Sequence, residues 1–207
     1  MTSSTVAPAA GDAVSASAIL DAALLLAEQR GWDAVHVYDI AQVLGIGLID
    51  IQRHFGDKDE IAEAWFDRAD AALLAQPQTP GWDALTHRQR LHRAICAWLD
   101  ALAPHRRVTA AMLRYKLQPE HVHLQVLGVM RISRTVQWVR EVAGVPSVGW
   151  RREIEEAVLT SIYLATFARW LADSSPGAAS TRRFLDRWLS LAERAALRLG
   201  SGSRRPD

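Results

Sequence analysis

Residues 39–55, DIAQVLGIGLIDIQRHF, decide the fold that this sequence predicts. Two short apolar segments lie on either side of Gly45, which permits a tight turn between them. Ala41 is small enough to let two helices cross closely, and Ile51 and Phe55 are spaced to anchor the second helix against the first. This arrangement is typical of a helix-turn-helix.

The rest of the chain repeats apolar residues at helical spacing, and no segment alternates in the manner of a strand. Glycine and proline end most of these segments. The sequence therefore predicts an all-α protein of about nine helices. We expect them at 17–30, 37–44, 48–55, 57–75, 83–103, 106–117, 119–143, 150–172 and 178–199.

The segment QPQTPG, with Pro77 and Pro80, breaks the helical pattern and predicts a domain junction. We expect a helix-turn-helix domain with its connecting helix at 17–75 and a larger helical domain at 83–199. The Ser-, Thr-, Ala- and Pro-rich segment 1–16 is expected to be a disordered tail, and 200–207 a flexible one.

The composition favours an ordinary globular protein, with 49% hydrophobic and 23% charged residues. Cys96 is the only cysteine, which excludes an internal disulfide and a cysteine-based zinc site. The chain has no apolar run of the roughly 18 residues that a membrane span needs, and no signal-peptide pattern at its start. These features predict a cytoplasmic protein.

The net charge of +1 hides a strong asymmetry along the chain. Residues 1–70 carry four Lys or Arg against twelve Asp or Glu, a net charge of −8, and residues 71–207 carry twenty against eleven, a net charge of +9. Because affinity for DNA depends largely on cations at the phosphates, an acidic N-terminal domain predicts DNA binding that is weak or strongly salt-sensitive.

Residues 18–65 resemble the N-terminal domain of the TetR family of regulators almost without gaps. The residues that carry the resemblance include Arg30-Gly31, Asp39-Ile40-Ala41, Gly45-Ile46, Phe55 and Lys58. The resemblance implies a DNA-binding homodimer that is controlled by a small apolar ligand. The DNA-contacting residues that it implies are Gly47, Gln52, Arg53, His54 and Lys58.

Several positions depart from the TetR pattern on the surface that would face DNA. Gly47 stands where the family usually has Ser or Thr, so it offers no side-chain oxygen to cap the helix or contact phosphate. Gln52 and His54 replace aromatic residues, and Asp50 adds a carboxylate that repels phosphate. If the domain reads DNA, Arg53→Ala and Lys58→Ala are each expected to weaken binding.

The C-terminal residues 138–187 are similar to a second family, the lipid-binding accessory protein of ubiquinone biosynthesis known as the ninth Coq protein. The most specific part is the segment Asp173-Ser174-Ser175-Pro176, followed by Thr181, by Arg183-Phe184-Leu185 and by Arg187. This resemblance implies the alternative function, a lipid- or isoprenoid-binding protein of TetR fold that does not bind DNA.

The larger domain is rich in aromatic and thioether side chains, which suit an adaptable apolar cavity between helices. The candidate ligand-binding residues are Trp98, Met112, Met130, Trp138, Tyr163, Phe167 and Trp170. The two helices at 150–199 carry apolar residues on more than one face, which predicts a four-helix interface between two copies of the chain. No catalytic or metal-binding pattern is present, so we expect no enzyme activity and no cofactor.

Overall fold

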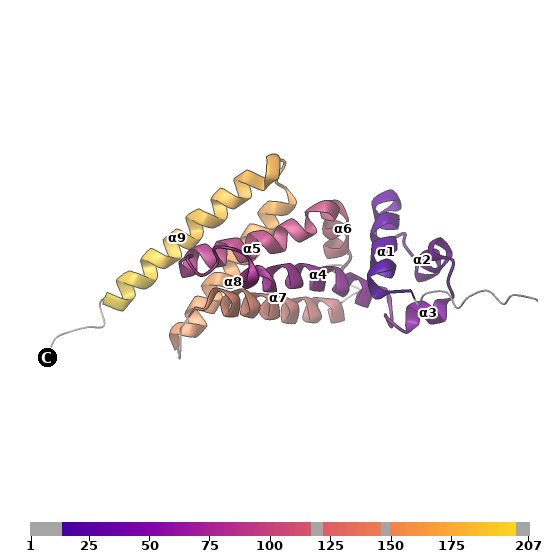
Figure 1. Cartoon of the computed structure of the whole chain (residues 1–207), viewed down its shortest axis with the longest axis horizontal. Coiled ribbons are helices and arrows are strands. Elements are labelled where there is room, and N and C mark those ends of the chain that lie inside the picture. The colour runs from indigo at the N-terminus through magenta and orange to yellow at the C-terminus, as the bar shows by residue number, and fades with distance from the viewer. Residues whose placement is uncertain (1–13, 117–121, 146–149, 202–207) are drawn as a thin grey trace, which may run out of the picture. The chain divides into compact units, whose positions relative to one another are not determined.

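The computed structural model describes residues 14–116, 122–145 and 150–201, and all regular structure within these ranges is helical (Figure 1). The nine α-helices of this part are α1 (Ala16–Arg30), α2 (Val37–Leu44), α3 (Leu48–Gln52), α4 (Lys58–Leu74), α5 (His87–Leu102), α6 (Arg106–Lys116), α7 (Val122–Ala143), α8 (Trp150–Leu171) and α9 (Ala179–Ser201). The predicted all-α class is confirmed. Most of the expected N-terminal tail and the end of the C-terminal one, residues 1–13 and 202–207, lie outside the described residues.

Within the described residues, two helix boundaries differ from those expected by three or more residues, and the others by at most two. The third helix ends at Gln52 rather than at Phe55, and Arg53 forms its C-terminal cap. The fifth begins at His87 rather than at 83, because the backbone N–H of Thr86 donates to Oε1 of Gln89 at 2.9 Å and fixes the start of α5. The four residues before Thr86 form a turn instead.

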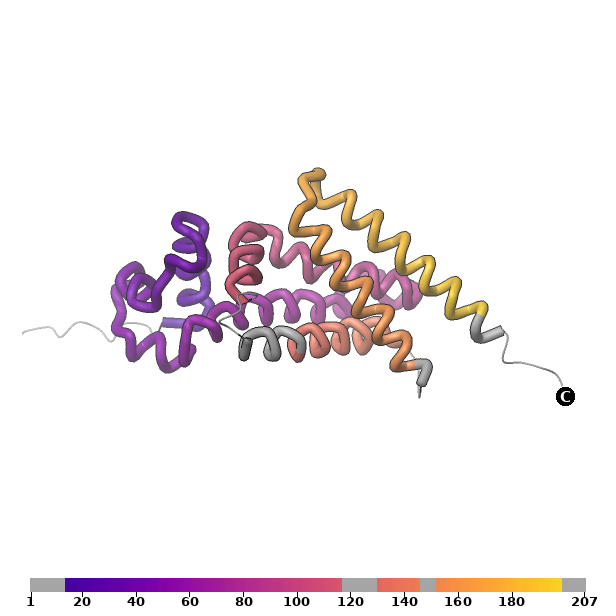
Figure 2. Tube along the Cα trace, turned by 180° about the vertical axis from the view of Figure 1, so that it is seen from behind, coloured from indigo at the N-terminus to yellow at the C-terminus, as the bar shows by residue number. Residues whose placement is uncertain are grey.

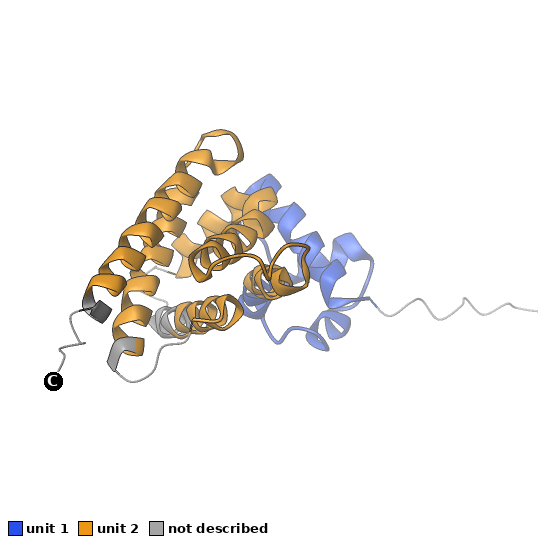
Figure 3. Cartoon of the chain, turned by 60° about the vertical axis from the view of Figure 1, so that its left-hand side comes forward, with its two compact units in different colours: residues 1–64 blue, residues 65–207 orange. Residues whose placement is uncertain are grey.

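The chain divides into two compact units, residues 1–64 and 65–207, and the division falls inside α4 (Figure 3). The sequence places the end of the N-terminal domain later, after residue 75. The second half of α4 packs with the larger unit, where Trp65 is buried and donates a hydrogen bond from Nε1 to Oγ1 of Thr109 at 2.9 Å.

In the larger unit α5 packs against α7, α8 and α9, so it lies at the centre of the core. Helices α8 and α9 run side by side, joined by a short 3₁₀ turn at Pro176–Ala178 (Figure 2). None of the helices in the described part of the chain is long and apolar enough to cross a membrane.

Candidate functional site

The helix-turn-helix forms as the sequence predicts. Ile40 and Ala41 of α2 are buried, and Gly45 ends that helix in the left-handed conformation at φ +66°. On α3 and the turn after it, Ile51 and Phe55 are buried against the core of unit 1. Four of the predicted DNA-contacting positions are exposed, namely Gly47, Gln52, Arg53 and His54.

Asp50 organises the exposed end of α3. Its Oδ2 accepts a hydrogen bond from the backbone N–H of Gly47 at 3.0 Å, which is the half of a capping box that the third residue of a helix supplies. The other half, a Ser or Thr hydroxyl that accepts an N–H of the first turn, is missing because Gly47 has no side chain. Its Oδ1 accepts a hydrogen bond from Nη1 of Arg53 at 2.8 Å. The guanidinium of Arg53 at the end of α3 is therefore paired with a carboxylate of the same helix.

Lys58 holds the loop between α1 and α2. Its Nζ donates to the backbone carbonyl of Trp32 at 2.7 Å and lies over the indole ring of the same residue, 4.9 Å from the centroid. Burial lowers the pKa of Lys58, and the nearby carboxylates of Asp33 and Asp59 partly offset this effect. The side chain assigned to a phosphate contact thus already has a structural role.

Every lysine and arginine of unit 1 has a partner inside that unit. The first 64 residues contain three of them, Arg30, Arg53 and Lys58. Arg30 pairs with Asp39 at 3.3 Å, and the other two are engaged as described above. Unit 1 is acidic, and its few cationic side chains are already bound to acceptors of the chain.

Four of the predicted ligand-binding residues form one aromatic cluster in the larger unit. The Trp98 ring lies 5.4 Å from that of Tyr163 and 5.1 Å from that of Phe167, both edge to face. Phe167 in turn stacks on Trp170, with centroids 5.9 Å apart. Met112 is fully buried. These rings pack against one another as they would in a closed core.

Two other predicted ligand-binding residues lie elsewhere. Met130 and Trp138 of α7 have 64% and 43% of their surface exposed, respectively. Neither Met130 nor Trp138 belongs to the aromatic cluster. Helical periodicity did not separate them from the buried set, because α7 is amphipathic only in part and carries apolar residues on its outer face.

A buried carboxylate adjoins the aromatic cluster. Asp70 of α4 accepts hydrogen bonds from Trp98 Nε1 at 2.8 Å and from Thr135 Oγ1 at 3.0 Å. Arg131 of α7 pairs with the other oxygen at 3.1 Å. Burial raises the pKa of Asp70, and Arg131 and the two hydrogen bonds oppose that rise. This network links α4, α5 and α7, and no motif in the sequence predicted it.

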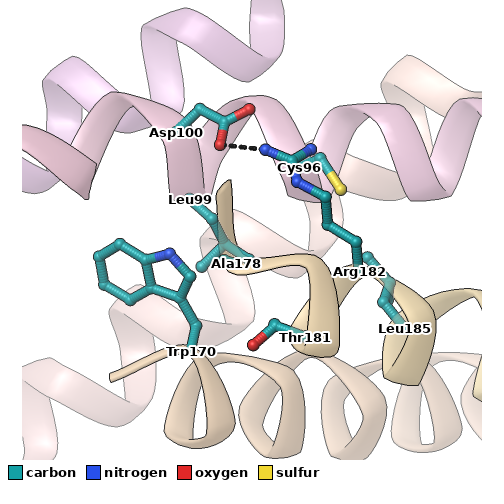
Figure 4. A pocket seen from close by; sticks show the side chains of 8 residues that line it. All are labelled: Cys96, Leu99, Asp100, Trp170, Ala178, Thr181, Arg182 and Leu185. Atoms are coloured by element: carbon teal, nitrogen blue, oxygen red, sulfur yellow. Dashed lines mark hydrogen bonds and ion pairs between the residues drawn. The ribbon is translucent and has the colours of Figure 1, made fainter. Parts of the chain in front are cut away.

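A small cavity lies between α5, α8 and α9, lined by residues that include Cys96, Trp170, Thr181 and Arg182 (Figure 4). Its volume is about 10 Å³, which is room for one water molecule and not for an organic ligand. Burial raises the pKa of the Cys96 thiol to about 11, so the thiol is unreactive at neutral pH. Among the described residues, no cluster of three His, Cys, Asp or Glu side chains could hold a metal ion.

Comparison with known proteins settles the family. The sequence model of the bacterial regulatory proteins of the tetR family matches residues 19–65. The chain is 46% identical to the TetR transcriptional regulator from Nitrosomonas europaea, covers 86% of its own length and 97% of that chain in the comparison, and superposes with a TM-score of 0.78. The chain belongs to the TetR family.

Further comparisons give one more solved structure and a second family model that matches only part of the chain. A TetR-like transcriptional regulator from Rhodococcus sp. RHA1 is 22% identical over 91% of this chain and 98% of its own, with a TM-score of 0.49. No match was found among curated proteins. The COQ9 family model matches residues 133–196, so the C-terminal part of this TetR-family chain has a likeness that the N-terminal part does not share.

The segment 173–176 within that match closes the turn between α8 and α9. The carboxylate of Asp173 accepts hydrogen bonds from the backbone N–H groups of Ser175 and Thr181, both at 2.8 Å, and from both of their hydroxyls at 2.6 Å. These bonds hold the pKa of Asp173 well below its usual range. These hydrogen bonds therefore stabilise the turn and fix the angle between the two C-terminal helices of this TetR-family chain.

An apolar groove runs along these two helices. It has a volume of about 580 Å³ and is lined by Ala157, Val158, Ser161, Ile162 and Ala165 of α8 and by Phe184, Trp188, Leu191, Ala192 and Ala195 of α9. Val158 and Trp188 are 41% and 46% exposed. The groove therefore leaves large apolar side chains of both helices partly exposed to solvent.

Proposed function

We propose that this TetR-family regulator is a homodimer that binds DNA through α3 and is controlled by a small apolar ligand in the core of its larger unit. The observation that carries the proposal is the 46% identity to a TetR regulator over most of the chain, combined with an intact helix-turn-helix whose outer face is exposed. In this mechanism the ligand must bind one spacing of the two reading heads better than the other.

The DNA contacts of the proposal come from the exposed face of α3 and the turn that follows. Gln52 and Arg53 have the side chains that pair with adenine and guanine edges in the major groove. Arg53 is 68% exposed in its side chain, so it can exchange its bond with Asp50 for one with a base or a phosphate. That exchange costs part of the binding energy, because the intrahelical pair must open.

Arg53→Ala is expected to weaken DNA binding by roughly tenfold to a hundredfold, the loss typical for one base-reading arginine. The thermal stability should hardly change, because the Arg53–Asp50 pair is exposed and such pairs contribute little. The measurement is a fluorescence-anisotropy titration against the region upstream of the gene. Arg114→Ala on α6 removes an exposed arginine of the other unit and serves as the matched control.

Asp50→Asn gives the opposite sign in the same assay. The amide oxygen can still accept the Gly47 N–H, while the charge that holds Arg53 and repels phosphate is lost. Affinity should therefore rise. Equal affinities of the wild-type protein and both variants would remove α3 from the interface with DNA.

The dimer of the proposal is formed by the groove of α8 and α9. Small residues at Ala157, Ser161 and Ala165 recur every four residues along α8, which allows a helix of a second copy to approach closely. Phe184 and Trp188 of α9 supply the large apolar side chains that such an interface buries. Two helices from each copy then make an isologous four-helix interface.

The ligand site of the proposal is the aromatic cluster around Trp98, Tyr163 and Phe167. These side chains are large and apolar, and Met112, which is fully buried, is of the adaptable kind found in such sites. Because the rings pack closely together, a ligand has to part them. The cluster adjoins Asp70 on α4, the helix whose first residues belong to the reading unit, so parting the rings would disturb that helix.

Addition of geranylgeraniol or palmitate is expected to raise the midpoint of thermal unfolding if either fits the cluster. A ligand at a hundred times its dissociation constant stabilises the folded state by about 2.7 kcal/mol. Phe167→Trp enlarges a side chain inside the cluster and should abolish the shift, whereas Met130→Ala on the exposed face of α7 should not. An equal shift in both variants would place the ligand elsewhere.

The second candidate function is a lipid- or isoprenoid-binding protein that does not bind DNA. Two observations favour it, namely the COQ9 match at residues 133–196 and the engagement of all three Lys and Arg side chains of unit 1. The two functions differ in one result. A protein that takes up an isoprenoid but selects no DNA sequence would support the second.

A further inference from the structure

Two large aliphatic side chains are exposed at the beginning of the reading helix. Leu48 and Ile49 are the first two residues of α3, and 54% and 59% of their surface is accessible to solvent. Helical spacing places them with Gln52 on the outer face, while Ile51 is turned into the core. Packing of unit 1 therefore gives no reason for aliphatic residues at these two positions.

Two of the polar groups beside these side chains, the N–H of Gly47 and the carboxylate of Asp50, are already paired within the chain. Gly47 has no side chain, and its N–H donates to Asp50. The same carboxylate binds Arg53. The surface that α3 offers with its first turn is thus mainly hydrocarbon. The two aliphatic side chains can recognise an apolar feature of a partner, whereas hydrogen bonds to bases would come from Gln52 and Arg53 at the other end of the helix.

Duplex DNA has one such feature in the major groove, the C5 methyl group of thymine. In a helix-turn-helix it is the N-terminal residues of the second helix that reach the base edges. We propose that Leu48 and Ile49 read thymine methyl groups, so that the operator half-site places thymines against the first turn of α3. This inference rests on the proposed DNA-binding function and names the bases that the reading helix selects.

The charge distribution of unit 1 supports this reading. Its three Lys and Arg side chains are bound to partners of the chain, so sequence-independent attraction to phosphates contributes less than in a basic reading domain. Apolar contacts with bases do not depend on counterion release. They give a domain of this charge a source of affinity that survives at physiological salt.

The test replaces thymine by uracil, which has the same hydrogen-bonding edge but lacks the methyl group. The half-site is first selected from random duplex DNA by the full-length protein and mapped by footprinting. Each thymine within it is then changed singly to uracil, and affinities are measured by anisotropy. We expect a loss of roughly fourfold at each thymine that is contacted, the value of one buried methyl group.

Leu48→Ala and Ile49→Ala provide the matched variants. Each should lose the thymine-to-uracil difference at one position and keep it at the others, and both should fold because the truncated side chains are exposed. Leu25→Ala, an equally exposed aliphatic position on α1, should keep every difference and serves as the control. Circular dichroism verifies the fold of all three.

Three results would overturn the inference. If uracil has no effect at any thymine of the selected site, the methyl groups are not read, although DNA binding itself stands. If the effect persists unchanged in both variants, other residues read the methyl groups. If the protein selects no sequence from random DNA, the proposed DNA-binding function fails and this inference fails with it.

Discussion

Val158→Arg is expected to convert the protein from a dimer to a monomer and to lower its affinity for a palindromic operator at least about a hundredfold. Val158 lines the apolar groove of α8 and α9 and is 41% exposed. In an isologous interface the substitution places two guanidinium groups, one from each copy, in a region that would exclude water. The free-energy cost of burying two unpaired guanidinium groups exceeds the free energy gained by burying the apolar side chains of the groove.

The loss of DNA affinity follows from the loss of the second reading head. Two linked heads bind two half-sites with an avidity roughly a hundred to ten thousand times that of one head. Analytical ultracentrifugation measures the oligomeric state. Leu74→Arg on α4 introduces the same charge at a position of similar exposure outside the groove, and it should remain dimeric. A dimeric Val158→Arg protein would show that the copies meet through another surface.

Asp70→Ala is expected to destabilise the protein by about 3–5 kcal/mol, the usual cost of removing one partner from a buried ion pair. The substitution leaves the Arg131 guanidinium without its buried partner and leaves Trp98 Nε1 and Thr135 Oγ1 without their acceptor. The midpoint of thermal unfolding should fall by on the order of 10 °C. Circular dichroism at 222 nm, in the far-ultraviolet helical band, follows the transition.

Asp67→Ala provides a close control for this prediction. Asp67 bonds the same guanidinium at 2.8 Å, but 60% of its side chain is exposed. Its removal should cost no more than about 1 kcal/mol, because water replaces the lost partner. If the two substitutions cost the same, burial is not what makes the Asp70 network important, and the link between α4 and the aromatic cluster is weaker than we infer.

The helix-turn-helix was predictable because its determinants are local. Gly45 ends α2, and Ile51 and Phe55 anchor the segment that follows, as their spacing indicates. The start of α5 at His87 was harder to predict, since the helical pattern begins earlier in the sequence than the cap at Thr86. Periodicity reports which face is apolar but does not report where the first turn closes.

The candidate sites were only partly predictable, because they depend on residues distant in sequence. The spacing of Asp50 and Arg53 on one helix could have indicated their pairing. By contrast, Lys58 reaches carbonyl groups 25 and 26 residues away, and Asp70 meets partners on α5 and α7. Nothing in the local pattern shows that Met130 is exposed while Met112 is buried. Those differences arise from tertiary packing.

The most direct test of the proposed function is a titration of the wild-type protein against its own upstream DNA, at low and at physiological salt, with non-specific competitor present. We predict saturable, competitor-resistant binding at physiological salt, with two protomers on each duplex. Such binding would mean that base contacts made by α3 compensate for the acidic charge of unit 1. Absence of specific binding at both salt concentrations would contradict the proposed regulator and favour the second candidate function, a TetR-family protein that binds a lipid or isoprenoid but not DNA.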